Sequence, residues 1–262
     1  MTQRDYFANG AIVNLKKILL DCEPKNIFLV TGKKSYENSG AKESIEILLK
    51  DVGVVRFSDF ETNPQFSDIQ RGVDYFREGN YDLVIAVGGG SVIDVAKSIN
   101  ILSANPKDLF SYIEKKEKIR IRGKPLIAIP TTSGSGSEAT HFSVVYRDKI
   151  KYSLADPIIL PDYAIVDPDL TMSMSKDLTA STGMDALSQA IESFWNINST
   201  EESKEYSKKA IEFIMSNLEK AVNDPSEKSR EAMAKASNLA GKAINITQTT
   251  ASHAVSYPIT SY

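Results

Sequence analysis

Three consecutive glycines stand between an apolar segment and an amphipathic one, in Gly88-Gly89-Gly90-Ser91. Because glycine has no side chain, the backbone can approach a diphosphate closely here, and the free N–H groups at the start of a helix attract anions. Asp94 and Lys97 follow in the first two turns of that expected helix. A plain tight turn is the alternative, but three glycines are costly for a turn alone. The pattern therefore favours a phosphate-binding loop, although it is not the GxGxxG dinucleotide fingerprint.

A second stretch is rich in hydroxyl groups and reads PTTSGSGSEAT, from Pro130 to Thr140. It follows a buried strand expected at 126–129, and α/β sheets bind their ligands at the carboxyl ends of parallel strands. A flexible linker is the alternative. Since a linker would hardly follow a buried strand inside a domain, the stretch is interpreted as a binding loop.

Candidate metal ligands lie further along the chain. Asp185 and Gln189 are four residues apart, so on a helix they share one face and can converge on an ion. An Asp near a helix start also commonly offsets the helix dipole. His253 stands among small residues, where a lone histidine is more often packed than a ligand. Neither feature alone identifies a metal site.

The elements that must position these residues alternate in the first half of the chain. Strands are expected at 26–31, 54–57, 82–87, 126–129 and 163–166, helices at 41–50, 67–78 and 92–102, and a hairpin at 141–154. The second helix is expected to begin at a cap formed by Ser67. Fully apolar strands that alternate with helices predict an α/β fold with a parallel sheet covered on both faces.

The sequence pattern changes after about residue 168, where helical periodicity replaces the alternation of apolar strands and helices. Helices are expected at 176–195, 201–222 and 227–244, the last of them capped by Ser226. Phe194 and Trp195 are expected to lie in the core. We therefore expect residues 1–168 to form a Rossmann-like nucleotide domain and residues 169–262 to form an all-helical domain.

Composition excludes several classes of function. The net charge of -3 and pI of about 5.6 argue against a nucleic-acid partner, which would normally meet a basic face. No apolar run is long enough for a membrane span, and the first residues lack the pattern of a signal peptide. The single cysteine, Cys22, cannot form an internal disulfide, which suits a reducing compartment. A cytoplasmic protein is expected.

Taken together, the motifs resemble the iron-containing alcohol dehydrogenase family. GGGSVIDVAK, PTTSGSGSEAT, KYSLADP, DPDLT and GMDALSQAIES occur in the order and approximate spacing of that family, and the resemblance covers almost the whole chain. It implies a dehydroquinate-synthase-like fold, in which NAD(P) lies in a cleft between the nucleotide domain and a helical domain that holds a divalent metal, Fe or Zn. GMDALSQAIESFW and NITQTTASHAVSYPITSY are similar to the branch that contains phosphonoacetaldehyde reductases.

The resemblance also implies a set of residues around the cofactor. They are Asn63, Gly88, Gly89, Gly90, Ser91, Asp94, Thr131, Thr132, Lys151 and Thr171. The glycines and Ser91 would meet the diphosphate, and Asn63 would lie near the adenosine end. Thr131 and Thr132 would contact the nicotinamide-side half and Lys151 the nicotinamide ribose, while the segment containing Thr171 would close over the cofactor.

The implied metal site departs from the family pattern. Asp185 and His253 match two of the four ligands, but Gln189 and Tyr257 stand where the family has histidines. A neutral amide is a poorer ligand than imidazole for Fe or Zn. Since the family's last ligand falls beyond Tyr262, we expect a fragment or truncated chain with an incomplete helical domain and weak metal binding.

The choice of nicotinamide cofactor depends on one position. Gly32 stands where NAD-preferring members carry an Asp that accepts from the ribose hydroxyls, and Lys33 and Lys34 follow it. Without the repulsion of a carboxylate a 2′-phosphate is tolerated, so NADP is expected and NAD is the alternative. The two lysines can also be read simply as a solvated pair on a turn.

The implied function is the NAD(P)H-dependent reduction of a small aldehyde to an alcohol by a homodimer, with a phosphonoaldehyde as one candidate substrate. One alternative is a dehydroquinate-synthase-like lyase or cyclase, which shares the fold and uses NAD and a metal. The other is a truncated, non-catalytic nucleotide-binding protein. Fold analogy alone does not separate them.

Overall fold

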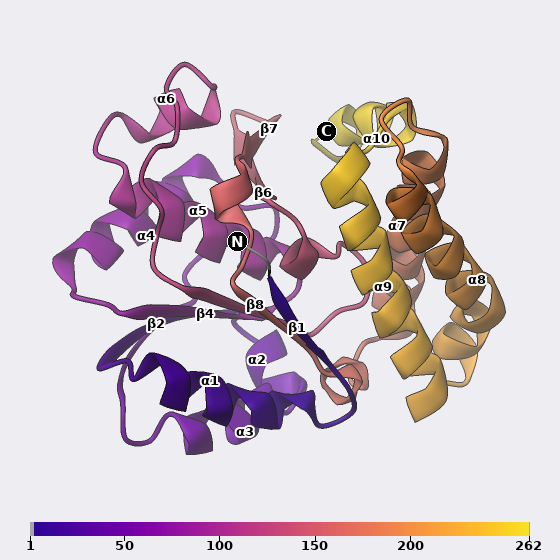
Figure 1. Cartoon of the computed structure of the whole chain (residues 1–262), viewed down its shortest axis with the longest axis horizontal. Coiled ribbons are helices and arrows are strands. Elements are labelled where there is room, and N and C mark those ends of the chain that lie inside the picture. The colour runs from indigo at the N-terminus through magenta and orange to yellow at the C-terminus, as the bar shows by residue number, and fades with distance from the viewer. Residues whose placement is uncertain (1–2, 262) are drawn as a thin grey trace.

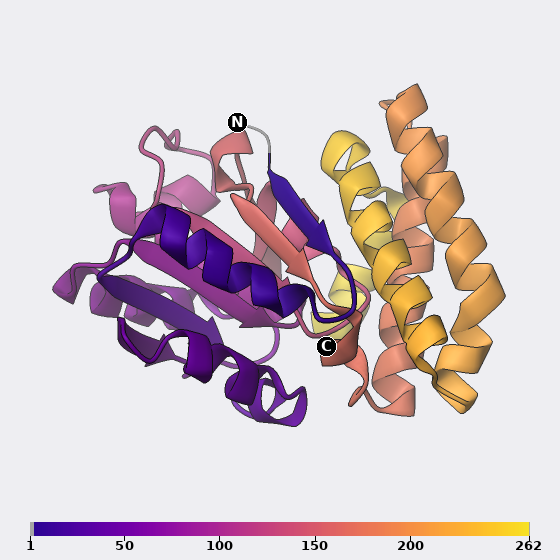
Figure 2. The same cartoon turned by 60° about the horizontal axis from the view of Figure 1, so that its bottom comes forward.

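A parallel sheet flanked by helices and a separate group of helices make up the chain, as Figures 1 and 2 show. The computed structural model describes residues 3–261, and the side chains of residues 257, 258, 260 and 261 are outside the described set. All elements up to the short helix η4 (Pro168–Thr171) belong to the sheet part, and those after it are helices. The mixed α/β architecture with a following helical region is confirmed.

The sheet of the described residues has six strands in the order β1-β8-β5-β4-β2-β3, all parallel. Their bounds are Arg4–Phe7 (β1), Asn26–Thr31 (β2), Gly53–Phe57 (β3), Leu83–Gly88 (β4), Leu126–Pro130 (β5) and Tyr163–Val166 (β8). The chain proceeds from β2 outward to β3 and then returns to β4 on the other side of β2. The sheet therefore has a topological switch point between β2 and β4, where such folds bind ligands at the carboxyl ends of the strands.

Alternate residues of each strand face opposite sides of the sheet, which creates two apolar cores. In β2, Phe28 and Val30 pack with α4 and α5, whereas Ile27 and Leu29 pack with α1 and α3. Figure 1 shows these helices above and below the sheet. Their bounds are Asn14–Cys22 (α1), Ser35–Asn38 (α2), Ala41–Leu48 (α3), Phe66–Glu78 (α4), Gly90–Ala104 (α5) and Leu109–Ile113 (α6). Both faces are covered, as the apolar strands predict.

The start of α4 differs from the expected one. The cap is Gln65 and not Ser67, because the Gln65 side chain accepts from the backbone of Asp68 while the Asp68 carboxylate accepts from the backbone of Gln65. This reciprocal pair satisfies two N–H groups that a lone serine would satisfy only in part. Helix α5 also begins earlier than expected, at Gly90, so the third glycine of the loop already belongs to the helix.

An antiparallel hairpin leaves the sheet between β5 and β8. It consists of β6 (Phe142–Arg147) and β7 (Ile150–Ala155), in agreement with the expected hairpin. Asp148 and Lys149 at its tip both have positive φ, as a tight two-residue connection requires. The hairpin packs against α5 and places Lys151 beside the helical part.

The helical part contains α7 (Lys176–Trp195), α8 (Glu201–Asn223), α9 (Glu227–Thr247) and α10 (Ala251–Ser261). The first three surround a core of small residues and a few large ones, among them Ala186, Ala190 and Ile214. Ser226 caps α9 as predicted. Phe194 and Trp195, expected in the core, are instead 46% and 63% exposed, because Glu192 and Ser193 occupy the buried face of the last turn of α7.

Two glycines of the loop after β5 let the sheet part and the helical part approach closely. A Cβ at Gly136 would lie 2.5 Å from the Cα of Gly241 in α9, and one at Gly134 would lie 2.5 Å from the Cβ of Thr182 in α7. Gly136 also has a φ of 60°, which L-residues rarely adopt. The loop is therefore packed between the two parts. Among the described residues, no helix is long and apolar enough to cross a membrane.

Candidate functional site

Chain connectivity brings most of the candidate cofactor residues to one edge of the sheet. Gly32 follows β2, Gly88 ends β4 and Thr131 follows β5, while Asn63 comes after β3. Since all strands are parallel, these positions lie at the shared carboxyl edge, on both sides of the switch point between β2 and β4. This is the edge of the sheet at which open α/β folds bind their ligands.

The glycine loop is in close contact with the loop after β5. The N–H of Thr131 donates to the carbonyl of Gly88 at 3.0 Å. A Cβ at Gly90 would lie 2.4 Å from the hydroxyl of Ser135, and one at Gly89 would lie 3.3 Å from the hydroxyl of Thr132. Side chains larger than hydrogen would therefore fill the space between the two loops. The start of α5 offers free N–H groups at this point, together with Ser91, which is partly exposed.

The hydroxyl groups of Thr131 and Ser133 are buried and have no hydrogen-bond partner in the described part of the chain. Buried hydroxyls are nearly always satisfied, and an unsatisfied one costs about 1–3 kcal/mol. Two such groups beside the glycine loop fit a site whose ligand supplies the missing partners. This observation supports the interpretation of PTTSGSGSEAT as a binding loop.

Asp94 and Lys97 are engaged by the protein itself. One oxygen of Asp94 accepts from the hydroxyl of Ser137 at 2.6 Å, and the other accepts from the N–H of Val144 at 3.0 Å. The ammonium of Lys97 donates to oxygens of Ser137, Thr140 and Phe142 at 2.5–3.1 Å. These contacts tie α5 to the loop after β5, so the geometry favours a positioning role for Asp94 over direct contact with the cofactor.

Burial sets the charge balance of this network. It raises the pKa of Asp94, whereas Lys97 and the hydrogen bonds from Ser137 and Val144 act in the opposite direction. It lowers the pKa of Lys97 to about 8 in spite of the attraction of Asp94 and Glu138. An acidic and a basic group whose pKa values burial shifts toward each other thus stand in the first two turns of the helix that follows the glycine loop.

Lys151 connects the cofactor side of the site with the helical part. Burial lowers its pKa to about 8, and the carboxylates of Asp94 and Asp185 oppose the shift. Thr171 lies in η4, is 2% exposed, and donates its hydroxyl to the carbonyl of Pro168 at 2.7 Å. Asn63 is exposed and has a φ of 60°. The contacts predicted for these three residues stay predictions.

A basic residue that the sequence did not single out stands beside Gly32. Arg56 near the end of β3 donates to the hydroxyl of Thr31 at 2.8 Å and to the carbonyl of Gly32 at 3.2 Å. Its guanidinium carbon lies 5.0 Å from the ring centre of Tyr36. Lys33 instead pairs with Glu61 at 2.9 Å. The pairing of β2 with β3 is what brings Arg56 here, which no local motif indicates.

The candidate metal ligands converge at the other side of the site. His253 of α10 places Nε2 3.3 Å from Oδ1 of Asp185 in α7. Two donors bound to one tetrahedral ion at about 2.0–2.1 Å lie roughly 3.3 Å apart, so this spacing suits a shared ion. The amide of Gln189 donates to Oδ2 of Asp185 at 3.2 Å, and its buried oxygen has no hydrogen-bond partner among the described residues.

These residues fit a divalent ion only as a partial set. The described part of the chain contains no group of three or more His, Cys, Asp or Glu side chains suited to a metal. Two strong donors and one amide oxygen are the ligands it offers. The side chain of Tyr257 is not among those that the structure describes.

Sequence reasoning also missed Glu192, whose carboxylate accepts from Nδ1 of His253 at 2.6 Å. Burial alone would raise the pKa of Glu192, but hydrogen bonds from His253 and Thr250 hold it below its usual value. A signal was present, because Asp185, Gln189 and Glu192 are spaced four and three apart and so share one helix face.

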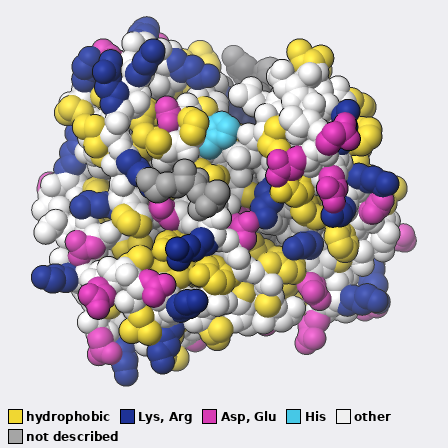
Figure 3. Space-filling model, in the orientation of Figure 1, with side chains coloured by type: hydrophobic (Ala, Val, Ile, Leu, Met, Phe, Trp, Pro, Cys, Tyr) yellow, Lys and Arg dark blue, Asp and Glu magenta, His cyan; other side chains and the backbone are white. Residues whose placement is uncertain are grey.

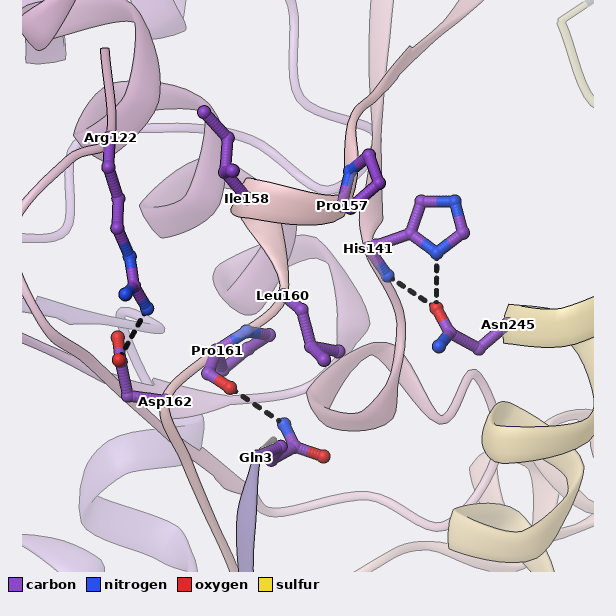
Figure 4. A pocket seen from close by; sticks show the side chains of 9 residues that line it. All are labelled: Gln3, Arg122, His141, Pro157, Ile158, Leu160, Pro161, Asp162 and Asn245. Atoms are coloured by element: carbon purple, nitrogen blue, oxygen red, sulfur yellow. Dashed lines mark hydrogen bonds and ion pairs between the residues drawn. The ribbon is translucent and has the colours of Figure 1, made fainter. Parts of the chain in front are cut away.

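A separate cavity of about 240 Å³ lies at the opposite edge of the sheet. Figure 4 shows it between Arg122, which pairs with Asp162, and His141, which pairs with Asn245 of α9. Gln3, Pro161 and Asp162 precede β1 and β8, so this is the amino edge. None of the predicted cofactor or metal residues lines the cavity, and we do not assign the site to it.

Charge is mixed on the face that Figure 3 shows, with acidic and basic side chains interspersed. Lys and Arg side chains gather at the upper left, over α6 and the segment after it. The N–H groups of the glycine loop and Arg56 are local groups that can attract a cofactor phosphate.

Comparisons with known proteins agree with this geometry. Residues 2–168 match the family model for iron-containing alcohol dehydrogenase, and residues 179–262 match the model for the C-terminal part of the Fe-containing family. The chain is 36% identical over 246 residues to NADPH-dependent butanol dehydrogenase of Clostridium saccharobutylicum, which covers 92% of this chain. This chain spans 62% of the length of that relative. It spans only about half of the length of a second relative, a long-chain-alcohol dehydrogenase.

Two solved structures are similar over nearly the whole chain. An iron-containing alcohol dehydrogenase from Thermotoga maritima superposes with a TM-score of 0.93 at 33% identity, covering 100% of this chain and 72% of that one. Sulfoacetaldehyde reductase from Bifidobacterium kashiwanohense, solved in complex with NAD+, gives a TM-score of 0.92 at 33% identity and covers 98% and 69%. Both folds match the sheet and the helical part together.

Proposed function

The chain belongs to the iron-containing alcohol dehydrogenase family, and on that premise we propose that it reduces a small aldehyde to an alcohol with NADPH. The observation that carries the proposal is the pair of unsatisfied hydroxyls, Thr131 and Ser133, beside the glycine loop at the switch point of the sheet. They lie where a dinucleotide would run along the carboxyl edge.

The residues of the sheet part bind and orient the cofactor in this proposal. Gly89, Gly90 and Ser91 present backbone N–H groups to the diphosphate. The hydroxyls of Thr131 and Thr132 face the nicotinamide half, and Asp94 and Lys97 hold their loop against α5. Lys151 interacts electrostatically with both Asp94 and Asp185, and it would hold the nicotinamide ribose next to the aldehyde.

The residues of the helical part face the aldehyde. Asp185 and His253 would hold a divalent ion, with the oxygen of Gln189 as a weaker donor. A bound nicotinamide would supply hydride to the carbonyl carbon, and the ion would polarise the carbonyl oxygen. The hydroxyl-rich loop, packed between the two parts, limits the access of water to the reacting atoms.

Preference for NADPH follows from the surroundings of Gly32. The position lacks the carboxylate that would repel a 2′-phosphate, and Arg56 is fixed beside it by two hydrogen bonds. A guanidinium has five N–H donors, so Arg56 can bind a phosphate while it keeps both contacts. The butanol dehydrogenase relative is named as NADPH-dependent, which supports the proposal.

An aldehyde that carries an anionic group is the substrate class we favour. Sulfoacetaldehyde, the substrate named for one structural neighbour, has a sulfonate, and the phosphonoaldehyde suggested by the sequence has a phosphonate of similar shape. The single cysteine supports a protein that works in a reducing compartment such as the cytoplasm. We retain the homodimer as a proposal, which sedimentation would test.

A pair of measurements tests the function. Calorimetric titration should show NADPH binding that falls by at least about a hundredfold, or about 2.7 kcal/mol, in Gly89→Val, with the unfolding transition unchanged. Gly89→Ala should give an intermediate loss, because its methyl lies just 3.3 Å from Thr132. NADPH oxidation with short anionic and neutral aldehydes then reports the reaction. Unchanged NADPH affinity in Gly89→Val would remove the loop from the site.

A further inference from the structure

Glu192 is a buried carboxylate at the end of the candidate metal site. It is 1% exposed and lies on the same face of α7 as Asp185 and Gln189, one further turn along the helix. Burying a carboxylate is costly unless hydrogen bonds satisfy it. The hydrogen bonds of Glu192 therefore indicate the role of this side chain.

Both oxygens of Glu192 are directed at one short segment at the start of α10. Oε1 accepts from Nδ1 of His253 at 2.6 Å. Oε2 accepts from the hydroxyl of Thr250 at 2.8 Å and from the N–H of the same residue. In the described part of the chain, these are all of its hydrogen bonds, and they span 58 to 61 residues of sequence.

The contact with the ring defines how the imidazole is presented. In the neutral ring, the shorter contact, 2.6 Å to Glu192 against 3.3 Å to Asp185, keeps the proton on Nδ1 and leaves the lone pair on Nε2. Nε2 is the nitrogen that faces Asp185 at 3.3 Å. Carboxylates in this arrangement orient metal-binding histidines and make them better donors.

We propose that Glu192 is a positioning residue for the metal centre, which fixes the Nδ1–H tautomer of His253 and anchors the start of α10 so that Nε2 meets Asp185. The inference rests on the proposed function in one respect, that Asp185 and His253 share a divalent ion. The state of the ring can be measured without any metal, which separates the two.

A purely structural role would look different. If Glu192 only capped α10, its bonds to Thr250 would be sufficient and the tautomer of His253 would not depend on it. Asp68 provides the matched case, because it is a buried carboxylate that accepts from the backbone N–H of Gln65 at the start of α4, while its other oxygen pairs with Arg71 and not with an imidazole. Asp68→Asn is therefore the control for Glu192→Gln.

The experiment combines ¹⁵N NMR of the histidine rings with calorimetric titration by Zn²⁺. The chain has two histidines, so the ring signals are few. At a pH that leaves the rings neutral, wild-type and Asp68→Asn chains should show His253 as the Nδ1–H tautomer, and Glu192→Gln should shift it toward a mixture. Zn²⁺ affinity should fall about 10–100-fold in Glu192→Gln and stay within threefold in Asp68→Asn.

The other outcomes have defined meanings. An unchanged tautomer in Glu192→Gln overturns the proposal, and so does an equal loss of affinity in Asp68→Asn. A shifted tautomer in a chain that binds no Zn²⁺ supports the positioning of the ring and counts against the metal in the proposed function. Should Glu192→Gln not fold, Glu192→Asp withdraws the carboxylate by one methylene and should give a smaller shift in the same direction.

Discussion

The sheet part and the helical part build their halves of the site by different means. In the sheet part, Gly32, Gly88 and Thr131 stand at the ends of strands or directly after them, and parallel pairing alone brings them to one edge. In the helical part, Asp185 and His253 are 68 residues apart on two helices and meet only through side-chain contacts. A backbone-built site depends on the fold, whereas a side-chain-built site depends on a few individual residues.

The largest effect is expected where the two parts meet. Gly136→Ala should lower the free energy of unfolding by about 4 kcal/mol, because the methyl would overlap the backbone of Gly241 and the residue has a positive φ. Gly10→Ala is the control, since Gly10 has a φ of 71° but no described atom within 4 Å beyond its chain neighbours. It should cost only about 1–2 kcal/mol. Equal losses in urea unfolding would show that the close approach does not matter.

The charged network behind the glycine loop should make stability depend on pH. The folded-state pKa of Lys97 is about 8, below the ordinary value of 10.5, so the unfolded chain holds more protons between these values. The free energy of unfolding should therefore rise with pH through this window, by up to about 3 kcal/mol from Lys97. Urea unfolding at several pH values should show a smaller rise in Lys97→Met than in wild type.

Lys33→Met is the control for that measurement, because Lys33 is exposed and paired with Glu61 at the surface. Its variant should follow the wild-type pH dependence. If Lys97→Met showed the same rise as wild type, Lys97 would not be the group that titrates.

One substitution should raise the metal affinity of the partial site in the helical part. We expect the wild-type chain to bind divalent metal weakly, to lose it on dialysis against a chelator and to show little aldehyde reduction. Gln189→His would add an imidazole one turn from Asp185 and should raise metal affinity about a hundredfold, or about 2.7 kcal/mol. Elemental analysis after dialysis is the measurement. Stoichiometric metal and brisk turnover in wild type would contradict the prediction.

The smallest effect is expected at Gly32. Gly32→Asp should shift preference toward NADH by about tenfold, or about 1.4 kcal/mol, through repulsion of the 2′-phosphate. A Cβ there would crowd the Ser35 hydroxyl, at 2.1 Å, and that side chain can rotate away. Gly32→Ala separates crowding from charge and should weaken both cofactors equally. Tighter NADH than NADPH binding by wild type would make the inference from Gly32 wrong.

The same contrast explains what could be predicted from the sequence. Strands such as Asn26–Thr31 and Tyr163–Val166 were predicted to the residue, because apolar runs between turn residues are a local signal. β1 (Arg4–Phe7) was not predicted, since this edge strand is short, polar and only partly covered. The cap of α4 was placed on Ser67 because a serine is a frequent cap, while the actual cap requires a reciprocal bond from Asp68.

The candidate site divides in the same way. The glycine loop is a sequence motif, so its place at the end of β4 follows from strand–helix alternation. Arg56 could not be identified without the tertiary structure, and the spacing of Glu192 from Asp185 indicated a shared helix face but not its partner His253. Arg56 reaches Gly32 through the pairing of β2 with β3, and Glu192 reaches His253 across the junction of α7 and α10.

Trp195 at the end of α7 is an intrinsic fluorescent probe. Trp195 is the only tryptophan of the sequence and is 63% exposed. The next residue, Asn196, donates to the carbonyls of Thr247 and Gln248, just before α10 begins. Indole fluorescence therefore comes from the junction that carries His253, while none comes from the sheet. Quenching or a spectral shift on adding a ligand would follow local rearrangement of this junction without an attached dye.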